Sequence, residues 1–210
     1  MKLVIAIDGP AAAGKGTLAR RLAAALGLTH LDTGLLYRAV GRRVLLAGAD
    51  PTDPAAALQA AEGLHLDDLA RTDLRGPAAD QAASAVAAIP AVRTALLAYK
   101  RRVAAGGAVL DGRDIGTVVV PDAPEKFFVT ANLTARARRR WQEQGGALDD
   151  VIAAMAARDA QDEHRATAPL RPAADAITID TSDMTADAVF DCAMTIIGGR
   201  GVAQSAHCPG

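Results

Sequence analysis

A glycine-rich loop close to the N-terminus restricts what this chain can fold into more than any other feature. The loop has the sequence Gly9-Pro10-Ala11-Ala12-Ala13-Gly14-Lys15-Gly16-Thr17. A short, β-branched apolar run over residues 3–7 precedes it. After Lys15, apolar residues recur at helical spacing as far as Leu26, and Gly27 is suited to end that helix. A buried strand, a glycine-rich turn and a helix in this order are the context that a phosphate-binding loop requires.

The residue types in this loop suit the binding of a polyphosphate. Glycines let the backbone wrap around phosphate oxygens, while successive N–H groups and the helix N-terminus supply positive potential. Lys15 adds a full charge near the transferable phosphate. Gly16 stands where such loops usually carry a Ser or Thr that ligates Mg²⁺, so we expect the hydroxyl of Thr17 to contact phosphate rather than metal. The alternative is a glycine-rich turn with a surface lysine.

Short apolar runs alternate with helical patterns along the rest of the chain. Besides residues 3–7, strands are predicted at residues 29–32, 108–110, 126–130 and 176–179. Helices are predicted at residues 15–26, 35–47, 92–105 and 133–144, and along the apolar stripe of Val189, Cys192, Ile196 and Ile197. This alternation predicts an α/β fold with a five-stranded parallel sheet that helices cover on both faces.

Two segments depart from this pattern. Residues 48–90 are rich in alanine, are interrupted by Pro51, Pro54 and Pro77, and contain no clear strand pattern, so we interpret them as an inserted helical subdomain. The segment from Arg158 to Pro172 is polar and has few large apolar residues. Its local stability should therefore be low in the absence of a ligand, as in a mobile lid.

Composition excludes several classes of protein. The chain has 23 Lys and Arg against 24 Asp and Glu, a formal net charge of −1, which argues against a protein that coats nucleic acid. No apolar run approaches the ~20 residues of a membrane helix, and the N-terminus reaches Asp8 too soon for a signal peptide. Cys192 and Cys208 lack a metal-type spacing and are predicted to be free thiols in a reducing compartment. We therefore expect a cytoplasmic protein.

The placement of arginine suggests a second anion site. The chain has 19 arginines and 4 lysines, and several arginines lie in loops beside carboxylates or glycines. These loop residues are Arg38, Arg113, Arg158 and Arg165. Arginine binds phosphate oxygens through two parallel hydrogen bonds, so this distribution suits a second phosphate site. A further group runs along one predicted helix, and we expect most of it to be solvated, with one or two members facing the nucleotide: Arg136, Arg138, Arg139 and Arg140.

Five blocks, in one order across nearly the whole chain, resemble the bacterial cytidylate kinase family, and the Gly-Lys-Gly-Thr ending of the loop looks like that of nucleoside monophosphate kinases. The blocks are Ile7-Asp8-Gly9-Pro10 with Gly14-Lys15-Gly16-Thr17; Leu31-Asp32-Thr33-Gly34 with Tyr37-Arg38-Ala39; Ala83-Ser84 with Val92-Arg93; Asp111-Gly112-Arg113-Asp114-Ile115-Gly116-Thr117-Val118-Val119 with Pro121-Asp122-Ala123; and Arg158-Asp159, Asp162, Arg165-Ala166, Ala168-Pro169-Leu170 and Pro172-Ala173-Ala174-Asp175-Ala176. The Gly-Arg-Asp-Ile-Gly-Thr-Val-Val block is the most specific of them.

The resemblance implies a single P-loop kinase domain over residues 1–210. Its core would comprise residues 1–48, 90–155 and 173–200, with an insert that binds the nucleoside monophosphate at about 49–89 and a lid at about 156–172. One departure stands out, because between about Glu62 and Arg75 the chain is shorter than members with a long insert. The fold of the insert, and its part in closure, are therefore left open.

The resemblance also implies roles for individual residues. The loop from Gly9 to Thr17 would hold the ATP phosphates. The base of CMP would be read by Ser84, Arg93 and Asp114, and its phosphate would be bound by Arg38, Arg113 and Arg165. Arg158 and Asp162 match positions that touch the sugar, and Thr33 is a further expected substrate contact. Catalysis would fall to Lys15, Arg38, Arg113, Arg158 and Arg165, with no metal bound by a dedicated protein site.

The implied reaction transfers the γ-phosphoryl group of ATP to CMP, and also to dCMP, with Mg²⁺ as cofactor in a monomeric enzyme that binds neither nucleic acid nor a membrane. Asp8 and Asp111 are candidates for holding a Mg²⁺-bound water. The alternatives are a sibling kinase for UMP, AMP or another small acceptor, and a non-catalytic module that binds nucleotide or RNA. Strong, salt-sensitive RNA binding without phosphoryl transfer would favour the second alternative.

The hydrogen-bonding pattern of cytosine agrees with these assignments. Cytosine presents an N4 amine donor beside the N3 and O2 acceptors, so a carboxylate such as Asp114 accepts from N4 while Arg93 and Ser84 donate to the acceptors. The alternative for Asp114 is a salt bridge with neighbouring Arg113, and the alternative for Ser84 is an ordinary small residue of an alanine-rich helix.

Overall fold

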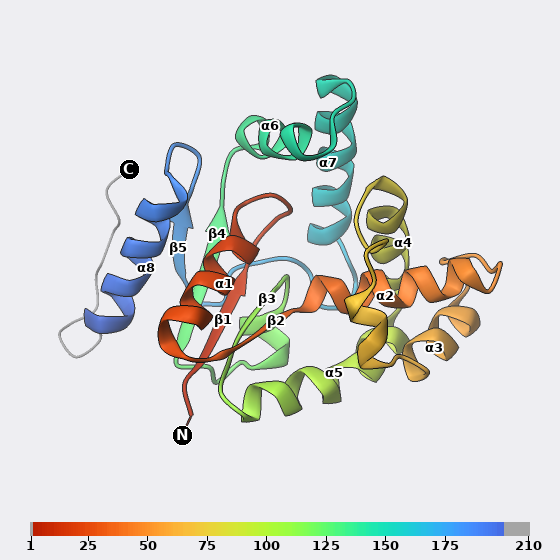
Figure 1. Cartoon of the computed structure of the whole chain (residues 1–210), viewed down its shortest axis with the longest axis horizontal. Coiled ribbons are helices and arrows are strands. Elements are labelled where there is room, and N and C mark those ends of the chain that lie inside the picture. Colours follow the sequence, from red (N-terminus) through yellow and green to blue (C-terminus); the bar gives the residue numbers. More distant parts are fainter. Residues whose placement is uncertain (1, 200–210) are drawn as a thin grey trace. The chain divides into compact units, whose positions relative to one another are not determined.

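The computed structural model of the chain describes residues 2–199 and forms two compact units (Figure 1). One of them, here called the core unit, joins Met1–Leu31 to Ala104–Gly210, and the other, the helical unit, spans Asp32–Val103. The predicted insert, residues 49–89, lies wholly inside the helical unit. That unit begins earlier and ends later than the insert, because flanking helices share its apolar core.

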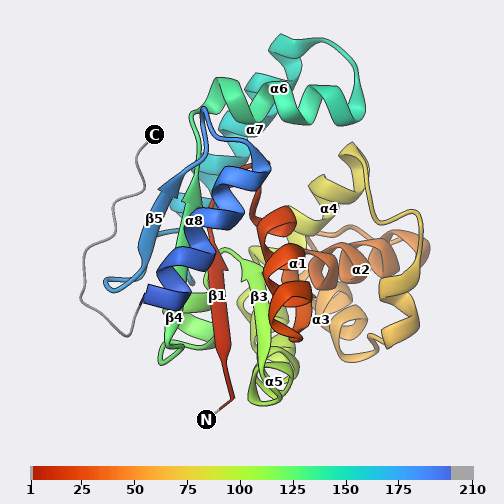
Figure 2. The ribbon, with the colours of Figure 1, turned by 60° about the vertical axis from the view of Figure 1, so that its left-hand side comes forward.

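The core unit is built on a parallel sheet of five strands. In chain order these are β1 (Val4–Asp8), β2 (Thr29–Asp32), β3 (Ala108–Gly112), β4 (Glu125–Thr130) and β5 (Ile177–Asp180). Their order across the sheet is β2-β3-β1-β4-β5, and Figure 2 shows β3, β1, β4 and β5 in this order. The register pairs Asp8 with Gly112 and with Phe128, so the carboxyl ends of β1, β3 and β4 meet at one edge. That edge is where open α/β sheets bind their ligands.

Helices α1 (Lys15–Leu26) and α8 (Ala186–Gly199) cover one face of this sheet, because the apolar side chains of helices and strands bury one another there (Figure 2). The main members of this core are Ile5, Ile7, Leu18, Leu22, Phe127, Val129, Ile179, Val189 and Ile196. The predicted α/β fold with five strands is confirmed, and the strand ends differ from the expected ones by no more than two residues.

Glycine is required where the chain leaves β1. Gly9 has φ +145°, and a Cβ built on it would lie 1.9 Å from the carbonyl oxygen of Val129. Gly14, with φ +94°, precedes the first residue of α1, and Gly27, with φ +65°, ends that helix by donating its N–H to the Ala23 carbonyl. The loop of residues 9–14 therefore turns tightly over the end of the sheet.

The helical unit packs around Leu36, Tyr37, Val40, Val86 and Leu96. It contains α2 (Thr33–Leu46), α3 (Pro54–Glu62), η1 (Leu66–Ala70), α4 (Pro77–Ala87) and most of α5 (Pro90–Ala105). Pro54 and Pro77 each occupy the first turn of a helix, where a missing N–H costs nothing. Among the described residues no single helix could cross a membrane; α4 and α5 reach that length and composition only together, and they bend by 96° between them.

The sequence patterns did not predict one long helix. Helix α6 (Leu133–Gln144) has the predicted bounds, but α7 (Leu148–Glu163) follows it directly and occupies the first part of the expected lid, residues 156–172. Its apolar residues Val151, Ile152 and Met155 pack against Ala11 and Ala137. A second element without a sequence signal is η2 (Ile115–Val119), a single π-helical turn after β3.

The prediction that Cys192 is a free thiol is wrong, because this residue of α8 is disulfide-bonded. Cys208 lies outside the described residues. A disulfide requires Cα atoms about 4.4–6.8 Å apart in space, and the spacing of two cysteines along a chain does not reveal that distance.

Candidate active site

The glycine-rich loop folds back on the lysine that follows it. Lys15, the first residue of α1, is 7 % exposed, and its Nζ donates a hydrogen bond of 2.5 Å to the Pro10 carbonyl. Ala12 has φ +57°, a conformation that a residue other than glycine adopts rarely and that occurs often at ligand sites. The strand, turn and helix expected around residues 9–17 are therefore present, with Lys15 at the inner side of the turn.

The charge environment of Lys15 favours an anionic ligand. Burial lowers the pKa of Lys15 well below its ordinary value, and the positive charge of Arg113 lowers it further, whereas Asp111 and Asp8 act in the opposite direction. The ammonium form of a buried amine beside a guanidinium is unfavourable unless a negative charge lies nearby. A phosphate bound on the loop would supply that charge and stabilise the ammonium form.

Asp8 organises the backbone at the edge of the sheet. Its Oδ1 accepts a hydrogen bond from the N–H of Ile115 and its Oδ2 accepts one from Gly116, each at 2.7 Å, which fixes the start of η2. Burial raises the pKa of Asp8 to about 6, although both hydrogen bonds lower it. Because both carboxylate oxygens of Asp8 already accept backbone hydrogen bonds, Asp111 is the better of the two candidates for holding a Mg²⁺-bound water.

The raised pKa of Asp8 predicts a pH dependence of stability. The folded chain holds this proton more tightly than the unfolded chain, in which the pKa is near 3.8. We expect the free energy of unfolding of the wild type, relative to Asp8→Asn, to be highest below about pH 4 and to fall by about 3 kcal/mol as the pH rises through 6. Urea unfolding of both proteins across that range measures the difference, and a constant difference would contradict the raised pKa.

Asp111 faces the residue that follows the loop lysine. A Cβ on Gly16 would lie 3.3 Å from Asp111 Oδ2, so a serine or threonine side chain at this position would crowd the carboxylate. His30, which the sequence analysis did not single out, places Nε2 3.4 Å from Asp111 Oδ1. Mg²⁺ in kinases is held by one or two carboxylates together with phosphate oxygens and water, and Asp111 fits that requirement. Among residues 2–199 no group of three or more His, Cys, Asp or Glu side chains could hold a metal ion.

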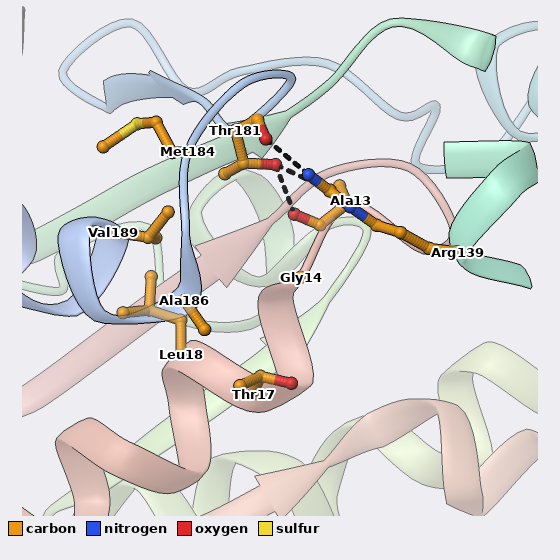
Figure 3. Close-up of a pocket in the computed structure, with 9 residues that line it drawn as sticks. All are labelled: Ala13, Gly14, Thr17, Leu18, Arg139, Thr181, Met184, Ala186 and Val189. Carbon is orange, nitrogen blue, oxygen red and sulfur yellow. Dashed lines mark hydrogen bonds between the residues drawn. The ribbon is translucent and has the colours of Figure 1, made fainter. Parts of the chain in front are cut away.

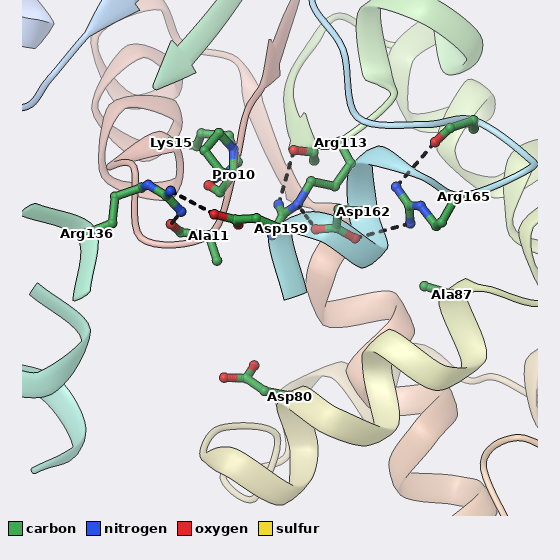
Figure 4. Close-up of polar contacts among 12 residues, drawn as sticks. Pro10, Ala11, Lys15, Asp80, Ala87, Arg113, Arg136, Asp159, Asp162 and Arg165 are labelled. Carbon is green, nitrogen blue, oxygen red and sulfur yellow. Dashed lines mark hydrogen bonds and ion pairs between the residues drawn. The ribbon is translucent and has the colours of Figure 1, made fainter. Parts of the chain in front are cut away.

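Asp162, near the end of α7, binds two arginines of the core unit, Arg113 and Arg165 (Figure 4). It accepts a hydrogen bond of 2.8 Å from Arg113 Nε, and Arg165 NH1 lies 3.6 Å from its second oxygen. Burial acts to raise the pKa of Asp162, but the charges of Arg113 and Arg165 hold that pKa below its ordinary value. Arg158 is close enough to lower the pKa of both Lys15 and Asp162. Four of the predicted site residues therefore lie together, and two of them, Arg113 and Arg158, are close enough to Lys15 to affect its pKa.

Asp114 lies on the same edge of the sheet, between β3 and η2. It is 5 % exposed, its carbonyl accepts hydrogen bonds from the N–H groups of Val118 and Val119, and its charge raises the pKa of Asp8. The salt-bridge alternative requires Arg113 as a partner. Arg113 donates from Nε to Asp162 and from NH1 to the Gly112 carbonyl.

A cavity of about 170 Å³ adjoins the phosphate loop (Figure 3). Its lining comprises Ala13, Gly14, Thr17, Leu18, Arg139, Thr181, Met184, Ala186 and Val189. Arg139 donates to the Thr181 hydroxyl at 3.0 Å and to the Thr181 carbonyl at 2.5 Å, and that hydroxyl donates to the Ala13 carbonyl at 3.0 Å. Ala13, Gly14 and Thr17 belong to the predicted phosphate loop, and Arg139 belongs to the arginine-rich helix. Sequence reasoning assigned no site role to the remaining lining residues, most of which come from a segment more than 150 positions further along the chain.

The other predicted substrate residues belong to the helical unit. Arg38 of α2 donates from Nε and NH2 to Asp80 Oδ1 at 3.0 and 2.9 Å. On α5, Arg93 donates to the Ala87 carbonyl at 3.2 Å, and its guanidinium lies 5.6 Å from the centre of the Tyr37 ring. Ser84 is half-buried on α4, and Thr33 is buried at the start of α2. The predicted site residues thus form one group in each unit.

A parallel sheet with a glycine-rich loop, a buried lysine and a cluster of arginines at the carboxyl ends of its strands defines the protein as a P-loop kinase. The family model for cytidylate kinase matches residues 5–198. The chain belongs to the cytidylate kinase family.

Individual relatives agree with this assignment. The cytidylate kinase of Paramagnetospirillum magneticum is 58 % identical over 95 % of this chain and 100 % of its own, and that of Granulibacter bethesdensis is 59 % identical over 94 % and 97 %. A solved structure of an uncharacterized protein from Eubacterium ventriosum superposes with a TM-score of 0.55, covers 95 % of this chain and 100 % of its own, and is 16 % identical. At that identity it shows the shared fold alone.

Proposed function

We infer that the protein is a cytidylate kinase, which transfers the γ-phosphoryl group of ATP to the 5′-phosphate of CMP and yields CDP and ADP. The observation that carries this function is the buried Lys15 on its glycine-rich loop, in a chain whose residues 5–198 match the family model. We further propose that dCMP serves as an acceptor. ADP release that depends on CMP tests the function, whereas salt-sensitive RNA binding without ADP release would favour a binding module.

On the donor side, the phosphate loop and the adjoining cavity supply a site for ATP. The backbone N–H groups of residues 9–17, Pro10 excepted, and the amine of Lys15 bind the phosphates. The cavity is smaller than the ~300–1,000 Å³ of sites that enclose a whole ligand, so it suits a single heterocyclic base. Met184 and Val189 offer apolar contact, and the guanidinium plane of Arg139 offers a surface on which the base can stack.

On the acceptor side, the proposed contacts follow the chemistry of CMP. Ser84 and Arg93 donate to the ring acceptors and Asp114 accepts from N4, while Thr33 is a further contact. The phosphate of CMP is bound by Arg38, Arg113 and Arg165, and the sugar is contacted by Arg158 and Asp162. In the free protein Arg38 is held by Asp80, and Arg113 and Arg165 are held by Asp162. These carboxylates keep the guanidinium groups ordered until phosphate competes for them.

The reaction needs alignment and charge neutralisation rather than a general base, because the attacking oxygen is already an anionic phosphate oxygen. Lys15, Arg113 and Arg158 concentrate positive charge where two polyanions meet. Mg²⁺, which Asp111 would help to hold, supplies further screening of the transferring phosphoryl group. The lid at about residues 156–172 has to exclude water during transfer, since water would otherwise hydrolyse ATP.

Arg38 should matter for CMP more than for ATP. Replacing Arg38 with Met removes a charged hydrogen-bond donor to the acceptor phosphate and is expected to weaken productive CMP binding by roughly 1.5–3 kcal/mol, while the KM for ATP stays near that of the wild type. Arg42→Met is the matched control, because Arg42 lies one turn further along α2 and pairs with the exposed Asp73. A raised KM for ATP with unchanged CMP kinetics would show that the two sites are assigned the wrong way round.

We also propose that the enzyme works in the cytoplasm as a monomer, without nucleic-acid or membrane partners. Its substrates are small soluble nucleotides, and the formal net charge of −1 does not favour binding to a polyanion. All proposed contacts to ATP and CMP come from one chain, so the mechanism requires no second copy.

A further inference from the structure

Arg136 is buried although it lies on the arginine-rich helix α6. Its side chain is 7 % exposed and contacts three residues, two of which, Ala11 and Asp159, are drawn in Figure 4. Nε donates to the Ala131 carbonyl at 2.8 Å, NH1 donates to the Ala11 carbonyl at 3.4 Å, and NH2 pairs with Asp159 Oδ2 at 2.7 Å. One guanidinium thus connects the end of β4, the phosphate loop and helix α7.

The partner carboxylate depends on this arginine. Asp159 is 14 % exposed in its side chain, and its second oxygen, Oδ1, is buried without a hydrogen-bond partner among the described residues. Removing one member of a buried ion pair leaves an uncompensated charge, which is strongly destabilising, whereas replacing both members with apolar residues is often neutral. A double apolar variant of this pair can therefore remove the link between α6 and α7 without the loss of stability that a single variant would cause.

Helix α7, to which Asp159 belongs, carries Arg158 and holds two further arginines through Asp162. Arg158 immediately precedes Asp159, and Asp162, one turn later, holds Arg113 and Arg165. Ala11 of the phosphate loop packs against α6 and α7 in the same place. The position of α7 relative to the phosphate loop therefore sets where Arg158 lies and where Asp162 holds Arg113 and Arg165.

We propose that Arg136 is a positioning residue for phosphoryl transfer: through Asp159 it fixes α7 against the phosphate loop and so sets the arginines that surround the transferring group. Arg136 itself does not touch the substrates in this role. The proposal rests on the proposed kinase function. It states that the ion pair between Arg136 and Asp159 affects kcat separately from its effect on the stability of the fold.

The test compares steady-state kinetics of the wild type with Asp159→Asn and with the double variant Arg136→Met, Asp159→Leu. Misplacement of catalytic groups by about an ångström can cost up to ~10²-fold, so we expect kcat of both variants to fall about 10–100-fold while the KM values for ATP and CMP change less than about threefold. The double variant should keep the wild-type Tm. Its ratio of ATP hydrolysis to CDP formation should rise, and amide exchange over residues 156–172 in the presence of ADP and CMP should be faster than in the wild type.

The matched control is Glu143→Gln, which neutralises an exposed carboxylate that pairs with Arg140 on the same helix and should leave kcat unchanged. A double variant with normal Tm and normal kcat would overturn the proposal, because the ion pair would then be structural only. Wild-type protein that releases no ADP with CMP would instead refute the kinase function itself, so the two failures are distinguishable.

Discussion

The Lys15→Met variant is expected to fold as the wild type does and to lose about 10²–10³-fold in kcat, the usual effect of removing one electrostatic contact from a transition state. Lys15 is buried against Pro10, and burial together with Arg113 makes its ammonium form unfavourable until phosphate arrives. Methionine fills similar volume without a charge, so the free protein should retain or gain stability.

Steady-state kinetics of CDP formation, with Tm as the check on folding, measures this effect. Lys2→Met is the control, because Lys2 is exposed and precedes β1. Near-normal turnover by folded Lys15→Met would mean that the glycine-rich loop is an ordinary turn with a lysine beside it.

A still larger effect is expected in the discrimination between CMP and UMP. UMP presents O4, an acceptor, where cytosine presents the N4 amine, so a buried Asp114 would face another acceptor. Sites that hydrogen-bond a substrate group reject analogues that lack it by ~10⁴-fold. Asp114→Asn keeps the size of the side chain but can donate its amide to O4, so it should lower kcat/KM for CMP and narrow the CMP/UMP ratio.

The rival interpretation is a structural ion pair between Asp114 and Arg113. It predicts that Asp114→Asn loses activity with both nucleotides and leaves the ratio of kcat/KM for CMP to that for UMP unchanged. Asp122→Asn serves as the control, since Asp122 is exposed in the turn after η2 and should alter neither rate. An unchanged ratio in Asp114→Asn would mean that Asp114 does not read the base.

Local patterns predicted the elements whose apolar residues follow a clear period. β2 and α6 have the predicted bounds, and α1 begins at Lys15 and ends before Gly27 as expected. α7 escaped prediction although Leu148, Val151, Ile152 and Met155 recur at helical spacing, because alanine and charged residues fill the positions between and after them. A polar, alanine-rich amphipathic helix is hard to distinguish from a mobile loop in a single sequence.

The candidate site was predictable only where its residues are neighbours in the chain. The glycines of residues 9–17 themselves indicate the turn that this segment forms. The pairs His30–Asp111 and Arg113–Asp162, in contrast, join residues that are 81 and 49 positions apart in the chain. The order of strands in the sheet and the packing of α7 bring such pairs together, and neither leaves a local signal. Arg136 is a further example. Its position in an arginine-rich helix predicted exposure to solvent, but packing against distant segments buries its side chain.

The acceptor preference of the wild-type enzyme distinguishes a cytidylate kinase from a sibling kinase for another nucleotide. ADP release from ATP is measured with CMP, dCMP, UMP and AMP as acceptors, and the phosphorylated product is identified in each case. We expect CDP to be formed from CMP, dCMP to be phosphorylated as well, and kcat/KM for UMP to be lower than that for CMP by ~10⁴-fold. Release of ADP with UMP or AMP at a rate equal to that with CMP, or no release with CMP, would contradict this expectation.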